Sequence, residues 1–307
     1  MKYPNNLNKE SLVGITALSS GAKDCIDEMN QAINNLRKHF NVIYTLNIYG
    51  DPVVSSSKEE RIKELNEILN EDINALIIAR GGDNLCDTLD SINYQKIYDK
   101  GLLVGGMSDP TSLLYILTTK YDLATYYGIN GKRYAKTDDY ILNNIKLLKG
   151  ENIIQKSYKE RNTISLNGDF KSKGIIIGGC IDTLRDHVFN TEFDNTLNFI
   201  EKYKEYNIVW YFDNYALTSS ELFKTLKYMK DNNYFKYSNT FIFGNTCYTD
   251  EDDDIYIESI KYILEDSNII FNANIGHIDP VFTIINGSLS TIEYKNKELT
   301  ILQERIR

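Results

Sequence analysis

The chain has 307 residues, of which 42% are apolar and 25% are charged, and its formal net charge is −9 at pH 7. This composition is typical of a soluble globular protein that buries a substantial core in one large or two ordinary domains. The negative charge argues against binding to the backbone of a nucleic acid, because proteins that do so usually carry a basic stripe.

Apolar runs alternate with helical patterns along the first 135 residues. Strands are expected where short apolar runs meet turn residues, at 12–18, 40–48, 73–82 and 101–106. Helices are expected where apolar residues recur every three or four positions, at 23–39 and 55–72, with a shorter one near 84–90. This alternation predicts a mainly parallel sheet with helices on both faces.

The pattern changes after about residue 135. Short strands are expected within 161–180 and at 207–215, 240–245 and 269–275, and helices at 138–150, 218–232 and 255–265. The pair Asn286-Gly287 predicts a turn in a series of hairpins over 280–304. We therefore predict an α/β chain with an N-terminal doubly wound parallel-sheet domain at 1–135, a linker region at 136–170 and a C-terminal mixed, strand-rich domain at 171–307.

The four cysteines are scattered and form no Cys-x-x-Cys pair; they are Cys25, Cys86, Cys180 and Cys247. This spacing favours reduced thiols over a disulfide framework or a zinc site. The first residues contain no long apolar segment, and no apolar run reaches about 18 residues, so neither a signal peptide nor a transmembrane helix is predicted. We expect a cytoplasmic protein.

The densest run of like charges, at 249–254, is acidic. Such runs are usually solvated, so a surface loop is the first interpretation and a cation site is the alternative.

Two of the expected strands end in a pair of glycines, Gly81-Gly82 and Gly105-Gly106. Reactive groups in open parallel sheets gather at the carboxyl ends of the strands, and glycine there lets backbone N–H groups point at a bound group. Neither pair has the signature of a dinucleotide-binding or P-loop segment, so the indication for a nucleotide site is weak. Each pair on its own is also compatible with an ordinary strand-to-helix turn.

Ser108 directly follows the second glycine pair and its strand, and Pro110 after it suits the first turn of a helix. A serine on a strand-turn-helix corner has the arrangement of a nucleophile elbow, which raises its hydroxyl above the sheet. The backbone N–H of Asp109 would then face the same space as one half of an oxyanion hole. The simpler alternative is a serine that caps the helix.

A serine nucleophile needs a base, and the chain has three histidines. His39 ends an amphipathic helix and His187 lies in a polar stretch, so we expect structural or surface roles for both. His277 follows an apolar strand and a glycine, which makes it the best candidate for the general base. Asp213 ends another apolar run and is the best placed carboxylate to orient that histidine, although an acid at such a position is often only a turn former.

Together these segments resemble the LD-carboxypeptidase family of serine peptidases over nearly the whole chain. This family includes muropeptide LD-carboxypeptidases and microcin C self-immunity peptidases. Gly-Gly-Met-Ser-Asp-Pro-Thr at 105–111 resembles the family's nucleophile motif. The segment at 175–184 resembles its Gly-Gly-Asn-Leu block, the segment at 208–229 resembles the block that supplies the acid, and the segment at 274–277 resembles its Gly-His block.

The resemblance implies a catalytic triad in which Ser108 is the nucleophile, His277 the general base and Asp213 the acid. It also implies an oxyanion hole formed by the backbone N–H groups of Gly82 and Asp109. Members of the family are usually cytoplasmic, need no metal and often form homodimers. We therefore expect a homodimer without a cofactor, a small peptide or muropeptide as its substrate, and no nucleic-acid or membrane partner.

Among the departures from the family pattern, Asp213 stands in place of a glutamate, Met107 of a tyrosine and Cys180 of an asparagine. Aspartate orients histidine in many unrelated triads, so we expect activity, with Glu205 as an alternative acid if Asp213 points away. The other two changes affect the substrate pocket. A muropeptide is the first expectation, a microcin C-like peptide-nucleotide amide is the alternative, and a catalytically inert binding homologue is the alternative of another class.

Overall fold

The computed structural model describes residues 1–159, 162–247 and 251–306. The chain divides into two compact units. The first comprises Met1–Ile153 and Thr283–Asn286, and the second comprises Ile154–Phe282 and Gly287–Arg307. In the described part of the chain, no helix combines the length and the apolar character needed to cross a membrane.

The first unit is built around a six-stranded sheet. Its strands are β1 (Leu12–Thr16), β2 (Asn41–Tyr44), β3 (Ala75–Ile78), β4 (Leu103–Gly106), β5 (Thr125–Tyr127) and β12 (Ile284–Asn286). Its helices are α1 (Ile26–Arg37), α2 (Lys58–Asn70), α3 (Tyr94–Lys100), α4 (Thr111–Thr119) and α5 (Asp139–Leu148), with short 3-10 segments η1 (Leu46–Tyr49), η2 (Leu85–Ser91) and η3 (Gly131–Ala135). The strand order is β12-β5-β4-β3-β1-β2, and all neighbours are parallel except β12, which is antiparallel to β5.

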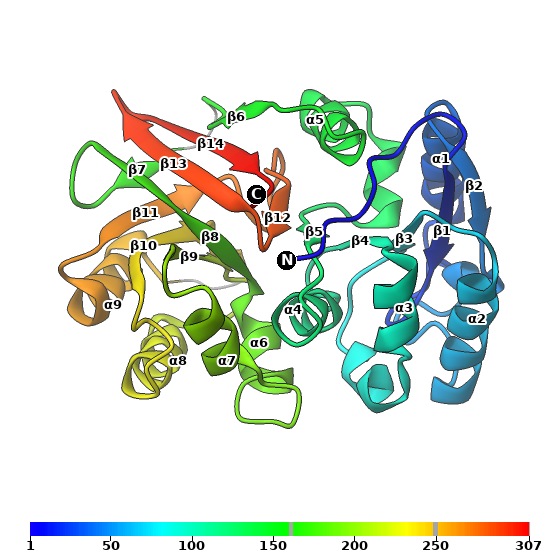
Figure 1. Ribbon diagram of the computed structural model, residues 1–307, viewed down its shortest axis with the longest axis horizontal. Coiled ribbons are helices and arrows are strands. Elements are labelled where there is room, and N and C mark those ends of the chain that lie inside the picture. Colours follow the sequence, from blue (N-terminus) through cyan, green and yellow to red (C-terminus); the bar gives the residue numbers. More distant parts are fainter. Residues whose placement is uncertain (160–161, 248–250, 307) are drawn as a thin grey trace. The chain divides into compact units, whose positions relative to one another are not determined.

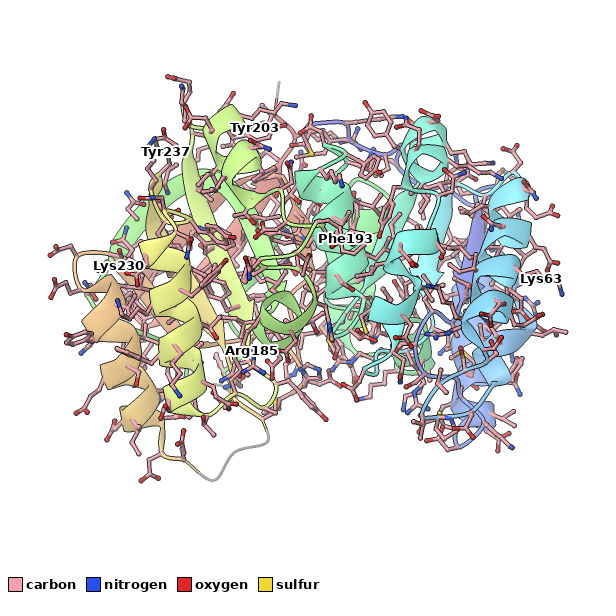
Figure 2. The ribbon with its side chains drawn as sticks, turned by 90° about the horizontal axis from the view of Figure 1, so that it is seen from below. Lys63, Arg185, Phe193, Tyr203, Lys230 and Tyr237 are labelled. Carbon is pink, nitrogen blue, oxygen red and sulfur yellow. The ribbon has the colours of Figure 1, made fainter. Side chains whose placement is uncertain are left out.

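Helices cover both faces of this sheet, with α1 and α5 over one face and α2, α3 and α4 over the other (Figure 1). This sidedness follows from right-handed crossovers, because the chain runs outward from β1 to β2 and then returns past β1 to β3. Both β3 and β4 are buried along their whole length, as central parallel strands should be. Charged side chains such as Lys63 of α2 lie on the outer surface (Figure 2). The predicted doubly wound parallel sheet is confirmed.

The helix α3 is not indicated by the apolar pattern of the sequence. This helix has seven residues, begins after Asn93, whose side chain accepts the Lys96 N–H at 3.0 Å, and ends at Gly101 in the left-handed region. Both end signals are present in the sequence, but two turns are too short to show a clear apolar period.

The second unit is built around an eight-stranded sheet with the order β6-β14-β13-β8-β9-β10-β11-β7. Its strands are β6 (Ile154–Lys156), β7 (Ile164–Ser165), β8 (Phe170–Cys180), β9 (Asn207–Asp213), β10 (Ser238–Gly244), β11 (Asn268–Ala273), β13 (Leu289–Lys295) and β14 (Glu298–Glu304). Its helices are α6 (Ile181–His187), α7 (Thr196–Lys202), α8 (Ser219–Asp231) and α9 (Asp253–Leu264).

The centre of this second sheet, from β8 to β11, is parallel, and antiparallel strands flank it on both sides. The sheet is therefore mixed and strand-rich, as predicted. Parallel pairing matters for the site because it brings the carboxyl ends of β8, β9, β10 and β11 to one edge of the sheet.

The hairpin predicted around Asn286-Gly287 is wrong. The strand before this pair, β12, joins β5 in the first sheet, whereas β13 after it joins β8 and β14 in the second sheet. The hairpin is formed by β13 and β14, and its turn is Asn296-Lys297, with φ angles of 52° and 64°. An Asn-Gly pair predicts a change of direction, but it does not specify which strand becomes the partner.

The acidic run at 249–254 lies partly outside the described residues, which exclude 249 and 250. Asp252 is the N-cap of α9 and Asp253 lies in its first turn, where the helix dipole favours negative charge. Among the described residues, no group of three or more His, Cys, Asp and Glu side chains is arranged to hold a metal ion.

The β13–β14 turn yields a stability prediction. Lys297 adopts a left-handed conformation that is unfavourable for a residue with a Cβ atom, so Lys297→Gly should raise the free energy of unfolding by roughly 0.5–1 kcal/mol. The matched control is Lys295→Gly, at the end of β13, which should lower it because glycine weakens a strand. Urea unfolding of both variants checks this, and a destabilised Lys297→Gly variant would contradict the assigned turn.

Candidate active site

Ser108 lies on the corner between β4 and α4, as predicted. Its φ angle is 71°, in the left-handed region that residues other than glycine rarely occupy. The helix α4 begins at Thr111 with Pro110 as its N-cap, so Ser108 lies two residues before the cap and is not the cap itself. The strained strand-turn-helix corner is the backbone geometry of a nucleophile elbow.

Hydrogen bonds from side chains to the main chain, together with close packing, hold this corner in place. The Ser108 N–H donates to the Tyr127 hydroxyl at 3.3 Å, and the Asn130 amide bonds both the N–H and the C=O of Met107, at 2.8 and 3.1 Å. A Cβ on Gly81 would lie 2.9 Å from the Cβ of Ser108, and real side chains do not approach so closely. Glycine is therefore needed at position 81 to leave space beside the serine.

Gly82 follows with a φ of 142°, a conformation open to glycine alone in practice. A Cβ at this position would collide with the hydroxyl oxygens of Ser19 and Ser20. Its N–H donates no hydrogen bond to any described residue, so it is available to a bound group. Asp109, whose N–H is the second predicted donor, is buried in the turn directly after Ser108.

The structure brings Asp213 and His277 together in the second unit. Asp213 is the last residue of β9 and is fully buried, while His277 follows β11 and is 14% exposed. The Nδ1 atom of His277 lies 3.0 Å from Oδ1 of Asp213. Because a carboxylate only accepts hydrogen bonds, Nδ1 carries the proton and Nε2 is left as the basic nitrogen.

Gly276 allows this approach. Its φ is 111°, and a Cβ on it would collide with the Asp213 carboxylate. The shorter side chain of Asp213 is thus matched by a main chain that comes close to it. Glu205, the alternative acid, is exposed.

Two residues near this pair were not singled out by the sequence analysis. The carboxylate of Asp182, in α6, accepts the N–H groups of Tyr215 at 3.0 Å and Ala216 at 2.9 Å, which lie in the loop after Asp213. The ring of Tyr215 packs against His277 with 4.4 Å between the ring centroids. Burial, together with the charge of Asp213, raises the pKa of Asp182. Asp182 follows the Gly-Gly-Cys segment in the sequence, but only the fold shows that it reaches this loop.

Cys180 ends β8 and pairs in register with Asp213. It is buried, and its thiol donates to Asp182 at 3.6 Å. Burial raises the pKa of this thiol well above its usual value, and the charges of Asp213 and Asp182 add to the effect. Cys180 therefore stays protonated near neutral pH and is unsuited to act as a nucleophile.

The other two histidines are found at the ends of helices. His39 follows α1 and is half-buried, and His187 is the last residue of α6. Neither pairs with a carboxylate among the described residues. Burial, with the nearby lysines, lowers the pKa of His39.

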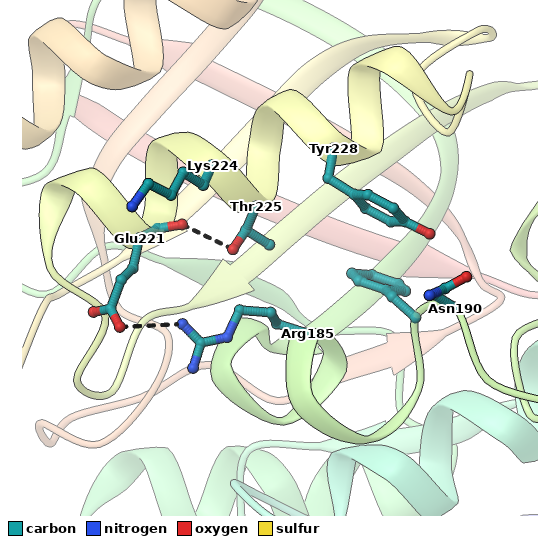
Figure 3. Close-up of a pocket in the computed structure, with 7 residues that line it drawn as sticks. Arg185, Asn190, Glu221, Lys224, Thr225 and Tyr228 are labelled. Atoms are coloured by element: carbon teal, nitrogen blue, oxygen red, sulfur yellow. Dashed lines mark hydrogen bonds and ion pairs between the residues drawn. The ribbon is translucent and has the colours of Figure 1, made fainter.

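A separate cavity of about 340 Å³ lies between α6 and α8 in the second unit (Figure 3). Two of its lining residues, Arg185 and Glu221, form an ion pair with 3.5 Å between nitrogen and oxygen. The Thr225 hydroxyl donates to the Glu221 carbonyl oxygen at 2.8 Å. None of the predicted catalytic residues is among its lining residues, which are Arg185, Phe189, Asn190, Glu221, Lys224, Thr225 and Tyr228.

Solved structures share this fold over the whole chain. An MccF-like protein from Bacillus anthracis str. Ames has a TM-score of 0.83 at 21% identity, with 100% of both chains covered. Muramoyltetrapeptide carboxypeptidase from Oxalobacter formigenes has a TM-score of 0.78 at 16% identity, covering 96% of this chain and 99% of that one. At these identities the likeness shows a common fold.

Sequence comparison extends this result to the family. The Microcin C7 self-immunity protein MccF of Escherichia coli is 36% identical over 75 residues, which span 24% of this chain and only 22% of that protein. Residues 13–128 match the family model for the LD-carboxypeptidase N-terminal domain, and residues 173–292 match the model for the LD-carboxypeptidase C-terminal domain. Because these two models of one family together match well over half of the 307 residues, the chain belongs to the LD-carboxypeptidase family.

Proposed function

We propose that the protein is a serine-type carboxypeptidase that hydrolyses a terminal amide of a muropeptide-like substrate through an acyl-enzyme. The observation that carries the proposal is the left-handed Ser108 on the corner between β4 and α4, in a chain of the LD-carboxypeptidase family. The hydrogen bond between His277 and Asp213 supports it with a histidine that is already oriented as a base.

In the proposed reaction, Nε2 of His277 takes the proton of the Ser108 hydroxyl as its oxygen attacks the carbonyl carbon. The C–N bond of the tetrahedral intermediate then breaks, and His277 returns the proton to the leaving amine. Water, deprotonated by His277, hydrolyses the ester on Ser108 and frees the acid. Asp213 keeps the imidazole in the required tautomer and stabilises its charged form throughout.

The N–H groups of Gly82 and Asp109 are the proposed oxyanion donors. Each lies on the turn at the carboxyl end of a neighbouring parallel strand, β3 for Gly82 and β4 for Asp109. Donors fixed in this way stabilise the charge that develops in the transition state without having to reorganise, which gives them their large effect on rate.

Two kinds of substrate are candidates for this site. One fold relative is named as a muramoyltetrapeptide carboxypeptidase, and another was solved in complex with aspartyl sulfamoyl adenosine. A peptide-nucleotide amide is therefore the second candidate, as the 36% identical segment of a self-immunity protein suggests. As for other members of this family, we propose a cytoplasmic homodimer.

Ser108→Ala should lower kcat/KM for an LD-linked muropeptide by about 10⁴-fold or more, because the nucleophile is lost while substrate binding remains. The control is Ser91→Ala, which removes an exposed hydroxyl from η2 and should leave the rate unchanged. Liquid chromatography of the released residue measures both. A Ser108→Ala variant with the wild-type rate would rule out the nucleophile and leave an inert or differently acting site.

Asp213→Asn should lower kcat by roughly 10³–10⁴-fold, because an amide can donate to Nδ1 of His277 and hold the wrong tautomer. Asp213→Glu should also lower it, by at least about tenfold, since the extra methylene must enter space beside Gly276 that is already filled. Asp231→Asn, exposed at the end of α8, is the control. Steady-state kinetics gives kcat for each variant. An Asp213→Glu variant with a higher kcat than the wild type would show that the site does not require the shorter aspartate side chain.

Muropeptide and peptide-nucleotide amide should be compared at equal concentrations on one preparation. We expect kcat/KM to be at least about tenfold higher for the muropeptide. The reverse order would assign the self-immunity chemistry instead. Turnover of neither substrate, together with a Ser108 that does not react with a fluorophosphonate, would favour the inert homologue.

A further inference from the structure

We propose that the side chain of Asp109 is a positioning residue for the oxyanion hole: it holds the loop that carries the Gly82 N–H in place beside Ser108. This inference rests on the proposed function, because it assigns a task to a residue next to the proposed nucleophile. The backbone N–H of Asp109 is one of the two proposed donors, so a single residue would supply one donor and fix the other.

The carboxylate of Asp109 is buried, with the residue 1% exposed. Its Oδ2 atom accepts the hydroxyl of Ser19 at 2.5 Å and the backbone N–H of Leu85 at 2.9 Å. The hydroxyl oxygen of Ser19 in turn accepts the N–H of Asn84 at 3.2 Å. A buried carboxylate is costly unless it is hydrogen-bonded, and bonds to an ionised acceptor are short and strong. These contacts therefore form a firm clamp.

The clamp joins the carboxyl ends of three adjacent strands. Ser19 follows β1, the loop from Gly81 to Leu85 follows β3, and Asp109 follows β4. The sheet order reverses between β1 and β3, and open α/β sheets bind their ligands at such a point. Asp109 thus fastens together the three turns that border the expected binding crevice of the first unit.

Gly82 lies directly against this clamp. The hydroxyl oxygens of Ser19 and Ser20 occupy the space that a Cβ on Gly82 would need. The N–H of Ser20 donates to the carbonyl oxygen of Gly81 at 3.2 Å, which fixes the peptide before Gly82. Any movement of Ser19 would therefore shift the Gly82 N–H.

The role is geometric. A negative charge in the same turn as a developing oxyanion would oppose it, so the carboxylate helps only through the positions it enforces. An asparagine keeps one acceptor oxygen for Ser19 and Leu85, so it should replace the aspartate in part. If the carboxylate of Asp109 acted through its charge alone, a neutral asparagine could not replace it even in part.

The test compares five variants of the full-length protein, which are Ser108→Ala, Ser19→Ala, Asp109→Asn, Asp109→Ala and Ser112→Ala. Ser112→Ala is the matched control, because the Ser112 hydroxyl bonds the backbone oxygen of Asp109 at 3.0 Å and leaves its carboxylate untouched. Steady-state kinetics on the muropeptide is measured together with the rate constant of labelling by a fluorophosphonate. The label needs no knowledge of the substrate, and its phosphoryl oxygen occupies the oxyanion hole. Thermal unfolding of each variant reports whether the fold is kept.

Ser19→Ala and Asp109→Asn should each lower kcat and the labelling rate by about tenfold to a hundredfold with KM nearly unchanged, as expected when a catalytic group is displaced by a fraction of an ångström to 1 Å. Asp109→Ala, if it folds, should be slower than Asp109→Asn. Ser112→Ala should behave like the wild type.

Wild-type kcat and labelling in folded Ser19→Ala and Asp109→Asn, with Ser108→Ala inactive, would overturn this inference and leave the proposed function standing. A raised KM with unchanged kcat would overturn it too, since it would indicate a role in substrate binding. An active Ser108→Ala variant would overturn the proposed function itself.

Discussion

A left-handed backbone at Ser108, with a φ of 71°, costs roughly 1–2 kcal/mol for a residue that carries a Cβ. The site in the first unit depends on packing that offsets this strain. Tyr127 bonds the main chain of Ser108, Asn130 bonds that of Met107, and Gly81 leaves room for the serine side chain. A strained residue survives only where its surroundings over-determine it, and such residues cluster at functional sites. The cost of the left-handed conformation of Ser108 thus explains why the turn between β4 and α4 is so closely packed and hydrogen-bonded.

The second unit meets a different demand, which is to keep a carboxylate buried beside an imidazole. Asp213 has no exposed surface, and its contact with Nδ1 of His277 supplies the hydrogen bond that burial requires. The close main chain at Gly276 compensates for a side chain one methylene shorter than glutamate. Asp182 then fixes the loop that follows, so that Tyr215 can pack on the histidine ring. The geometry of the proposed base therefore rests on residues at the first turn of α6 and at the carboxyl ends of β9 and β11.

The sequence predicts those features that depend on local pattern. Buried strands show as apolar runs, and Ser108 and Asp213 each stand where such a run ends, so their places at strand ends could be predicted. Contacts between distant segments could not. Nothing near Asp182 indicates that its carboxylate caps the loop after β9, and nothing near Asp109 indicates that it clamps Ser19. The hairpin predicted around Asn286-Gly287 fails for the same reason, because β12 finds its partner in another sheet.

The central claim is that Ser108 is an activated nucleophile. Its most direct test is peptide mapping by mass spectrometry after reaction of the folded protein with a fluorophosphonate. We expect one equivalent of label, on the peptide that contains Ser108, and no label on the unfolded chain. Labelling of another residue in the folded protein, or no labelling at all, would contradict it.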